Sequence, residues 1–353
     1  QIDAYFISED MYGEPIDPPL INWEEPINWS GEEERTILED LYYPEHERFY
    51  GRRDIDTRKL IYDYFWIDYK QAAQKFTFEN ENRRHYNEKT GQYDGEIYNL
   101  EGKRVPIKDR SSFIMHDKVN VYPDTLCWIS DLSYSYNEPM TIMYFWAPAY
   151  DNYPVVGVNW KQATAFCIWR TNLMNNYLNS VGEPFVQDYR LPIEGEWEYA
   201  ARGGNDLAVY PWGGPYTRND KGCFLANFKP LRGDYLDDGG LYTVEVAIYE
   251  ANDFGLYDMA GNVAEWTSSA FDESGYSFTH DLSPDYKFNA LPDDLPVMKR
   301  KVVRGGSWKD IAYYLQNGTR TYEYQDSAKS YIGFRCVRPY MGPDETGASS
   351  NVY

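Results

Sequence analysis

The sequence predicts an α+β fold with irregular, loop-rich packing. Aromatic residues make up 18% of the 353 residues, and 26 Gly and 20 Pro accompany them. In such a mixture large flat side chains fill the space between loops, and their hydroxyl groups reach out of the core. The same composition argues against a helical bundle or a coiled coil. The length suggests about two domains, or one large domain with an insertion.

Charge and hydropathy exclude several classes of partner. The formal net charge is −22, from 34 Lys and Arg against 56 Asp and Glu. Phosphates require clustered cations, so nucleic acid and anionic membrane surfaces are not expected as main partners. No apolar run approaches the ~18 residues of a bilayer-spanning helix.

The N-terminal part is punctuated by proline. Residues 1–30 have the pattern of extended chain, in which Ile21-Asn22-Trp23 and Ile27-Asn28-Trp29 look like short β or docking segments. Ser30 stands three residues before Glu33, which is the spacing of a capping box. A helix is therefore expected to begin at Ser30.

The next segments predict a helix and then strands. A helix is expected from about Asp56 to Lys75, where apolar residues form most of one stripe. Residues 76–112 are polar and are expected to form a hairpin or a long surface loop. Residues 113–146 alternate better and predict strands, ending in the apolar stretch 143–146.

The most regular helical pattern follows a short apolar run. Val155–Val158 has the composition of a buried strand, and Asn159 then caps a helix with Gln162 at the reciprocal position. Apolar residues recur at intervals of three and four until Gly182 ends the helix. A shorter acidic helix is expected over Glu194–Arg202, stopped by a pair of glycines.

Common catalytic and metal-binding motifs do not occur in the sequence. The four cysteines form no C-x-x-C pair and the four histidines are isolated. A zinc ribbon, a thioredoxin-type site or a helical histidine site is therefore not expected. The phosphate-binding loop, the dinucleotide fingerprint and the serine-hydrolase elbow do not occur either, which excludes the common nucleotide-binding and serine-hydrolase designs.

A series of motifs resembles the formylglycine-generating-enzyme (sulfatase-modifying factor) family. The resemblance covers about residues 154–340 and implies an irregular α+β variant of the C-type-lectin fold with a large insertion. Residues 1–23 are then expected to be an extended N-terminal segment of a truncated core, 24–150 a family-specific insertion, 151–340 the core and 341–353 a flexible tail. The motifs follow in the family's order: Val158-Asn159-Trp160, Phe166-Cys167, Arg190-Leu191-Pro192, Glu196 to Gly204, Tyr210 to Gly213, Asn252 to Trp266, Val303 to Trp308 and Gly333-Phe334-Arg335-Cys336.

The residues that carry the family's oxidase chemistry are missing. In the copper-dependent members two cysteines between the R-G-G-S and G-F-R-C blocks bind the metal and the substrate thiol, whereas Trp308–Arg335 contains no cysteine. Asn317 and Ala312 fall near the two expected positions, and no Met or His replaces the thiolates that Cu(I) selects. The motif of the family's iron-dependent branch is missing as well. The resemblance therefore implies a protein without copper and without enzymatic activity.

Two structural features of the family are matched. A disulfide joins the family positions that match Cys167 and Cys336, which implies the same bond here and an oxidising compartment. The alternative is a pair of buried free thiols, and Cys127 and Cys223 have no assigned role. Structural calcium is implied by oxygen ligands of the kind that this ion prefers, the alternative being carboxylates that cap backbone amides. The first set comprises Asp258, the carbonyls of Gly261 and Val263, and Glu265; the second comprises Asn227, the Phe228 carbonyl, Asp238 and the Gly240 carbonyl.

The stretch around the start of the core is similar to the PorK/GldK lipoprotein family of Bacteroidetes. The similarity rests on Tyr134 to Thr141, Met143 to Trp146 and Pro148 to Trp160. It implies a non-catalytic structural ring subunit of the periplasmic type IX secretion and gliding machinery, a lipoprotein attached to the outer membrane. The expected partners are a PorN/GldN-type protein and copies of the chain itself, with outer-membrane proteins as further contacts.

Aromatic side chains of the insertion are candidate contacts in such a ring. Because Trp and Tyr dominate binding hot spots, they could anchor a partner, or equally pack the insertion onto the core. The acidic surface suits a basic partner. Two other functions stay open, an active formylglycine-generating-type oxidase and a lectin-like module that binds sugar or peptide. The candidate contacts are Trp23, Trp29, Tyr42, Tyr43 and Trp66.

Overall fold

The computed structural model divides the chain into two compact units, which are described separately. The first is Gln1–Ile61 with Asn120–Tyr122, and the second is Tyr62–Val119 with Pro123–Tyr353. Trp23, Trp29, the expected helix start at Ser30 and the tail 341–353 lie outside the described residues. The structure describes residues 6–9, 13, 15–21, 25–26, 28, 31, 36, 39–73, 86–87, 92–93, 95–132, 140, 143–230, 234–279 and 285–339.

The described residues of the first unit form an antiparallel strand pair and several short 3-10 turns. Strand β1 (Phe6–Glu9) pairs with β2 (Pro15–Ile21), with an irregular register between Ile7 and Glu9. An isolated bridge joins Tyr42 to Ile55. The 3-10 turns are η2 (Glu39–Leu41), η3 (Glu45–Glu47), η4 (Phe49–Gly51) and η5 (Thr57–Lys59).

A long strand replaces most of the helix that the sequence predicted over 56–75. Strand β3 (Ile61–Ile67) pairs with β8 (Ile114–Asn120), and only the short helix α2 (Tyr69–Ala72) follows it. Burial along β3 alternates with a period of two, and the rings of Tyr62, Tyr64 and Trp66 stack at 5.5 Å intervals. Aromatic and β-branched residues favour such a pleated surface, so the prediction of a helix here was wrong.

The polar segment 76–112, for which a hairpin or a long surface loop was predicted, contains hairpins. Strand β6 (Glu96–Tyr98) pairs with β7 (Arg104–Pro106), and β4 (Tyr86–Asn87) pairs with β5 (Gln92–Tyr93). The turn η6 (Arg110–Phe113) then leads into β8. A small core gathers under the hairpin from Ile97, Ile107, Phe113 and Met115.

Within the described part of 113–146, which omits 133–139 and 141–142, only the first of the predicted strands forms. After β8, Cys127–Asp131 is the short helix α3, and 143–146 is helical at Met143 and turn over 144–146 rather than strand. Trp128 is fully buried and stacks on Trp308 at 5.9 Å, so tertiary packing overrides the local alternation. The turn η7 (Pro148–Tyr150) follows. Val155–Val158 is buried in part but is not a strand: Gly157 exchanges hydrogen bonds with Lys329 and Asp124 instead of joining a ladder.

The predicted helices of the core are confirmed. Helix α5 (Trp160–Val181) begins with the reciprocal cap of Asn159 and Gln162 and ends at Gly182, whose φ is 78°. Helix α6 (Glu194–Arg202) ends at Gly203 in the left-handed region. Ile193 provides no side-chain cap for α6, but its N–H donates to Glu196 Oε2 at 3.0 Å.

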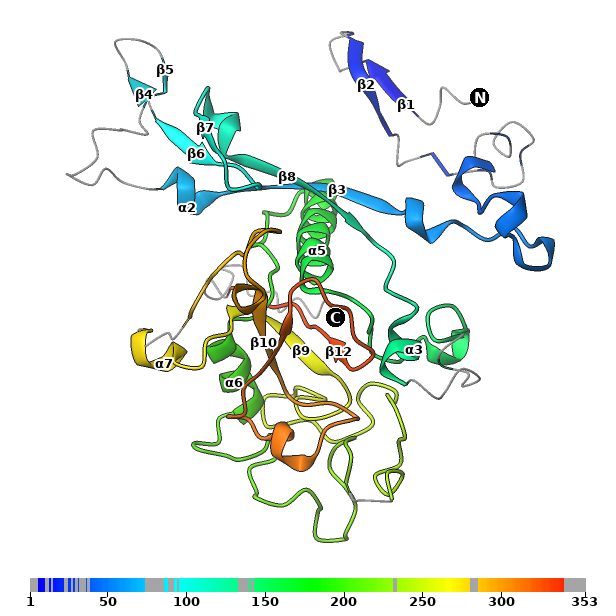
Figure 1. Cartoon of the computed structure of the whole chain (residues 1–353), viewed down its shortest axis with the longest axis vertical. Helices are drawn as coiled ribbons and strands as arrows, with labels where there is room; N and C mark the ends of the chain where they lie inside the picture. The colour runs from blue at the N-terminus through cyan, green and yellow to red at the C-terminus, as the bar shows by residue number, and fades with distance from the viewer. Residues whose placement is uncertain are drawn as a thin grey trace. The chain divides into compact units, whose positions relative to one another are not determined.

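A four-stranded sheet in the order β11-β10-β9-β12 forms the centre of the core, and α6 lies beside β9 and β10 (Figure 1). Strand β9 pairs antiparallel with β10 and parallel with β12. Among the residues that the structure describes, no helix has the length and hydropathy needed to cross a membrane. The remaining bounds are β9 (Ala264–Ala270), α7 (Gly275–Phe278), η8 (Pro296–Lys299), β10 (Arg300–Arg304), η9 (Ala312–Leu315), β11 (Thr321–Tyr324) and β12 (Ile332–Gly333).

Candidate functional site

Of the two positions at which sulfur was expected, Asn317 lies in the packed core and Ala312 is half-buried against it. Ala312 opens η9, and its carbonyl accepts a hydrogen bond from the Tyr210 hydroxyl at 3.2 Å. Asn317 is fully buried, donates from Nδ2 to the Ala208 carbonyl at 3.2 Å, and its N–H donates to the Val209 carbonyl at 2.8 Å. Both positions are therefore tied to the same segment, 208–210, by contacts that need no sulfur.

Close packing continues around these positions. Leu315 is fully buried, and a Cβ added to Gly306 would meet its Cδ1 at 2.9 Å. A side chain at Gly306 would therefore collide with the turn, and the φ of 68° at this position also favours glycine. Ala312 and Leu315 pack into one cluster with Tyr210 and Phe228. The arrangement fits a structural core rather than an open reactive site.

Asn317 Oδ1 is buried without a hydrogen-bond partner, whereas the polar side chains of the loop after β10 contact other groups of the chain. Ser307 donates to Asp310 Oδ2 at 2.6 Å, and burial raises the pKa of Asp310. Lys309 Nζ lies 3.4 Å from the centre of the Tyr331 ring, and burial lowers the pKa of Lys309. These contacts hold the loop after β10 in place, and they supply neither a thiolate nor a metal-binding cluster.

In the first predicted calcium set, the guanidinium group of Arg335 occupies the Glu265 carboxylate. Glu265 accepts from Arg335 Nε at 2.6 Å and from Trp197 Nε1 at 2.7 Å, both at Oε2, and its Oε1 pairs with the same guanidinium. Burial raises the pKa of Asp258, whose Oδ2 accepts the Ala247 N–H at 2.8 Å. Arg335 therefore supplies the positive charge that Glu265 needs, and this set fits calcium poorly.

The second predicted set fits a hard cation better. Asp238 accepts the N–H of Phe228 at 2.6 Å and the N–H of Gly240 at 3.2 Å, so the structure brings these residues together. Burial raises the pKa of Asp238. Asn227 is fully buried and its Oδ1 has no hydrogen-bond partner, an unmet acceptor of the kind that calcium binds. Within the described residues no group of three His, Cys, Asp or Glu side chains forms a metal cluster, so any ion here would depend on the Asp238 carboxylate together with amide and backbone oxygens.

Asn262 joins the loops that carry the two calcium sets through hydrogen bonds. The sequence did not single out this residue. It is buried, has a φ of 62°, and its side chain exchanges hydrogen bonds at 3.1 Å with the backbone of Val244. Its backbone carbonyl accepts the Trp308 N–H at 2.9 Å. An Asn between a glycine and an apolar run, where left-handed backbone is tolerated, was the available signal.

Cys167 and Cys336 are neighbours, as the family pairing implied. Their Sγ atoms lie 3.4 Å apart, within hydrogen-bond distance, and no disulfide bond joins them in the structure. The hydrogen bond to Cys336, followed by burial, raises the pKa of the Cys167 thiol. The disulfide stays a prediction. Cys127 is buried, which raises its pKa and fits an inert thiol, whereas Cys223 is exposed.

The described aromatic residues of the predicted partner surface make contacts within the chain. Tyr42 and Tyr43 are half-buried, with Arg53 lying over the first ring and Arg58 over the second. Trp66 packs against the core under the β6–β7 hairpin. Their contact with a partner stays a prediction.

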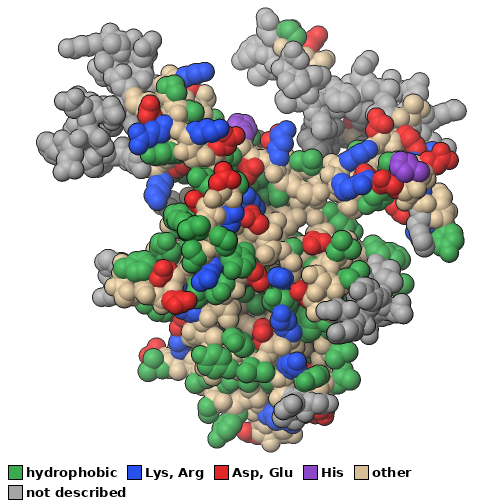
Figure 2. Space-filling model, viewed as in Figure 1, with side chains coloured by type: hydrophobic (Ala, Val, Ile, Leu, Met, Phe, Trp, Pro, Cys, Tyr) green, Lys and Arg blue, Asp and Glu red, His purple; other side chains and the backbone are tan. Residues whose placement is uncertain are grey.

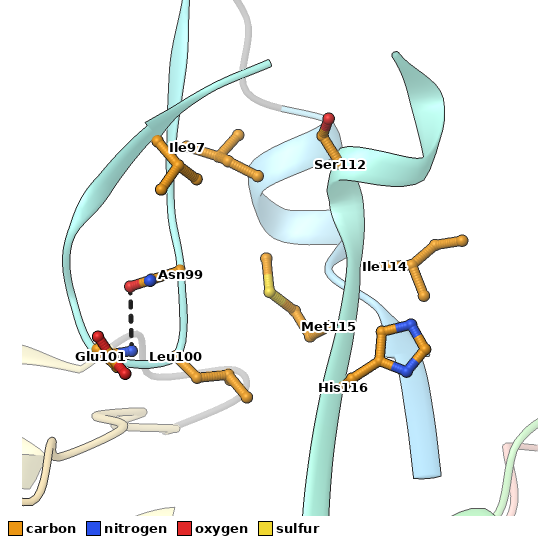
Figure 3. A pocket seen from close by; sticks show the side chains of 9 residues that line it. Ile97, Asn99, Leu100, Glu101, Ser112, Ile114, Met115 and His116 are labelled. Atoms are coloured by element: carbon orange, nitrogen blue, oxygen red, sulfur yellow. Dashed lines mark hydrogen bonds between the residues drawn. The ribbon is translucent and has the colours of Figure 1, made fainter. Parts of the chain in front are cut away.

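A shallow cavity of about 360 Å³ lies between the β6–β7 hairpin and β8 (Figure 3). Its wall includes Ile97, Leu100, Met115 and His116, and Asn99 Oδ1 accepts the Glu101 N–H at 3.1 Å. Apolar side chains share the lining with Glu101, Ser112 and His116, and Figure 3 shows these three polar side chains on separate parts of the wall.

Comparison with known proteins identifies the family. Residues 117–340, more than half of the chain, match the model of the sulfatase-modifying factor enzyme 1-like domain. The chain belongs to this family, the formylglycine-generating-enzyme type of domain that the motifs indicated.

Individual relatives include inactive and active members. The inactive C-alpha-formylglycine-generating enzyme 2 of Bos taurus is 36% identical over 192 residues, which cover 52% of this chain and 50% of that protein. The formylglycine-generating enzyme of Mus musculus is 32% identical over 196 residues, which cover 54% of this chain and 45% of that protein. The chain thus spans about half the length of the curated relatives that it matches. Among solved structures, PvdO from Pseudomonas aeruginosa overlaps 54% of this chain and 63% of its own, with 23% identity and a TM-score of 0.40.

Proposed function

We propose that this chain is a non-catalytic member of its family whose fold serves as architecture. The observation that carries the proposal is the occupation of the oxidase positions by Ala312 and Asn317, both bonded to the 208–210 segment. A methyl group and an amide cannot hold Cu(I) as a pair of thiolates does. The name of the bovine relative, which includes the word inactive, supports the same interpretation, although active enzymes are also among the relatives.

The assembly that we propose is the ring of the type IX secretion and gliding machinery. The similarity of the segments within 134–160 to PorK/GldK lipoproteins supports this assignment. The chain would lie in the periplasm as an outer-membrane lipoprotein and would pair with a PorN/GldN-type protein. Its net charge of −22 suits a basic partner, and steering by opposite charge would speed their encounter.

A pull-down from a Bacteroidetes envelope, followed by measurement of particle size, tests the assembly. We expect a PorN/GldN-type protein to co-purify in particles far larger than the chain, and we expect high salt to weaken the complex. A lone monomer under these conditions would contradict the proposal.

A second assay tests the loss of catalysis. The chain is incubated with copper and a Cys-containing sulfatase peptide, with an active formylglycine-generating enzyme as the positive control. We expect aldehyde from the control enzyme alone. Formation of aldehyde by this chain would show that it is an active enzyme and would contradict the proposal.

A further inference from the structure

Helix α5 carries apolar side chains on two faces, one of which faces solvent. The inner face packs Ala163 and Cys167 into the sheet cluster with Trp266. Along the outer face the exposed apolar residues recur at intervals of three and four, and each is between 40% and 60% exposed. We call these residues the α5 stripe: Phe166, Trp169, Leu173, Tyr177 and Val181.

The α5 stripe is continuous and of appreciable size. It extends about 22 Å along the helix axis, from the 1.5 Å rise per residue. The rings of Phe166 and Trp169 are 5.4 Å apart, and Phe334 meets the first of them edge-on. From the exposed fractions, the five side chains offer on the order of 500 Å² of surface, an amount that marks an interaction site.

Helix α5 itself carries no carboxylate, and Asp326, from outside the helix, pairs with Lys161 near its start. No Asp or Glu occurs from Asn152 to Gly182, whereas the whole chain carries 56 of them. The charged residues of α5 are Lys161 and Arg170 alone. Hydrophobic side chains also gather in patches on the face drawn in Figure 2, but acidic groups interrupt that surface.

We infer that the α5 stripe is a self-association surface that binds the α5 stripe of a second copy of this chain. Two copies that each carry −22 repel each other over most of their surface, and a carboxylate-free apolar stripe is where that repulsion is smallest. A two-fold contact uses the same patch on both copies. Helix against helix is the arrangement that fits a narrow stripe.

An antiparallel crossing centred on Leu173 gives a self-complementary pairing. Trp169 then faces Tyr177 of the other copy, and Arg170 faces Asn176 rather than a second cation. Both aromatic side chains are exposed and can pair across the axis. About 1,000 Å² buried in total lies at the lower end of specific interfaces, so the dimer is expected to be of micromolar strength.

Sedimentation velocity of the purified 353-residue chain over a range of protein and salt concentrations tests the inference. We expect a monomer–dimer equilibrium that salt strengthens, because screening reduces repulsion between like-charged copies. Leu173→Asp would place two carboxylates against each other on the axis and weaken the dimer at least about tenfold. Trp169→Ala is a second variant that removes apolar contact without adding charge. The matched control is Leu207→Asp, at a side chain 89% exposed and away from the stripe, and it should leave the dimer unchanged.

Several outcomes would overturn the inference. A monomer at every concentration and salt level excludes self-association, and a dimer that Leu173→Asp leaves intact excludes this surface. Leu173-dependent binding of the chain to phosphatidylcholine vesicles, without a dimer in solution, would assign the stripe to lipid instead. None of these outcomes bears on the envelope pull-down, because that experiment reports on a different partner.

Discussion

Arg320 donates two hydrogen bonds to the Glu194 carboxylate, from Nε to Oε1 at 2.6 Å and from Nη2 to Oε2 at 2.9 Å. The pair joins the start of β11 to the first residue of α6. Arg304, which is fully buried, lies 3.6 Å from the same carboxylate and also pairs with Glu198. Two guanidinium groups therefore depend on Glu194 for charge compensation, and that of Arg304 does so at a fully buried position.

Glu194→Gln is expected to destabilise the fold strongly. The amide keeps the shape of the side chain but removes the carboxylate that pairs with Arg320, and it leaves the buried Arg304 to share Glu198 with Arg202. Loss of one partner in a buried ion pair costs roughly 3–5 kcal/mol. Urea unfolding followed by Trp fluorescence measures the change in the free energy of unfolding.

Glu196→Gln is the control on the same helix. Glu196 pairs with Arg190 at 2.6 Å, and both side chains are about two-fifths exposed. Solvent screens such a pair, and its loss should cost at most about 1 kcal/mol. If both variants lower the free energy of unfolding by the same amount, the Glu194 ion pairs contribute no more to stability than the exposed Glu196–Arg190 pair.

The sequence predicted elements that are determined by neighbouring residues. The box formed by Asn159 and Gln162 and the glycine at 182 are local signals, and α5 follows them. Strand β3 was predicted as helix because its apolar residues fit both periods, and its partner β8 lies about fifty residues further along the chain. Pairing of that kind has no local signature.

The candidate site was predictable in its composition but not in its contacts. The missing cysteines and the neighbouring positions of Cys167 and Cys336 followed from motif order. The pairing of Arg335 with Glu265, 70 residues apart, could not be predicted from motif order. This pairing makes the second calcium set better suited to an ion than the first. Long-range ion pairs form when loops pack, so a single sequence does not reveal them.

Lys301 should make stability depend on pH in the alkaline range. Its side chain is fully buried, donates to the Phe288 carbonyl at 2.7 Å and lies 3.9 Å from the Trp160 ring centre. Burial lowers the pKa of Lys301 to about 8. The unfolded chain therefore holds this proton more tightly than the folded chain, and the free energy of unfolding rises with pH from about 8 to ~10.4.

Lys301→Met isolates that contribution. Between pH 7 and pH 9.5 the wild type should gain ~2 kcal/mol relative to the variant, because the variant has no proton to lose at this position. Chemical denaturation at both pH values gives the difference, and Lys221→Met, at an exposed side chain, is the control. Parallel pH profiles for the wild type and Lys301→Met would contradict the prediction.

Calcium is expected to stabilise the chain through the second oxygen set. Asn227 Oδ1 has no hydrogen-bond partner and Asp238 is half-buried, so an ion would satisfy an acceptor and a charge together. Adding calcium after EGTA treatment should raise the melting temperature, by the linkage between binding and folding. The shift should disappear in Asp238→Asn and persist in Asp258→Asn. The opposite result would place the ion at the Asp258 set, beside Arg335.

The Cys167–Cys336 pair should be oxidised when the chain is produced in an oxidising compartment. The sulfurs are already 3.4 Å apart, so a small side-chain rotation brings them to bonding distance. The bond would close a loop between residues 169 positions apart, and on the chain-entropy model it stabilises by roughly 3–5 kcal/mol.

Thiol titration in denaturant without reductant should count two free thiols among the four cysteines. Cys336→Ser should lower the melting temperature in oxidised samples and much less in reduced ones, whereas Cys223→Ser, at an exposed position, should do neither. Four free thiols in protein recovered from an oxidising compartment would show that the pair functions as two buried thiols.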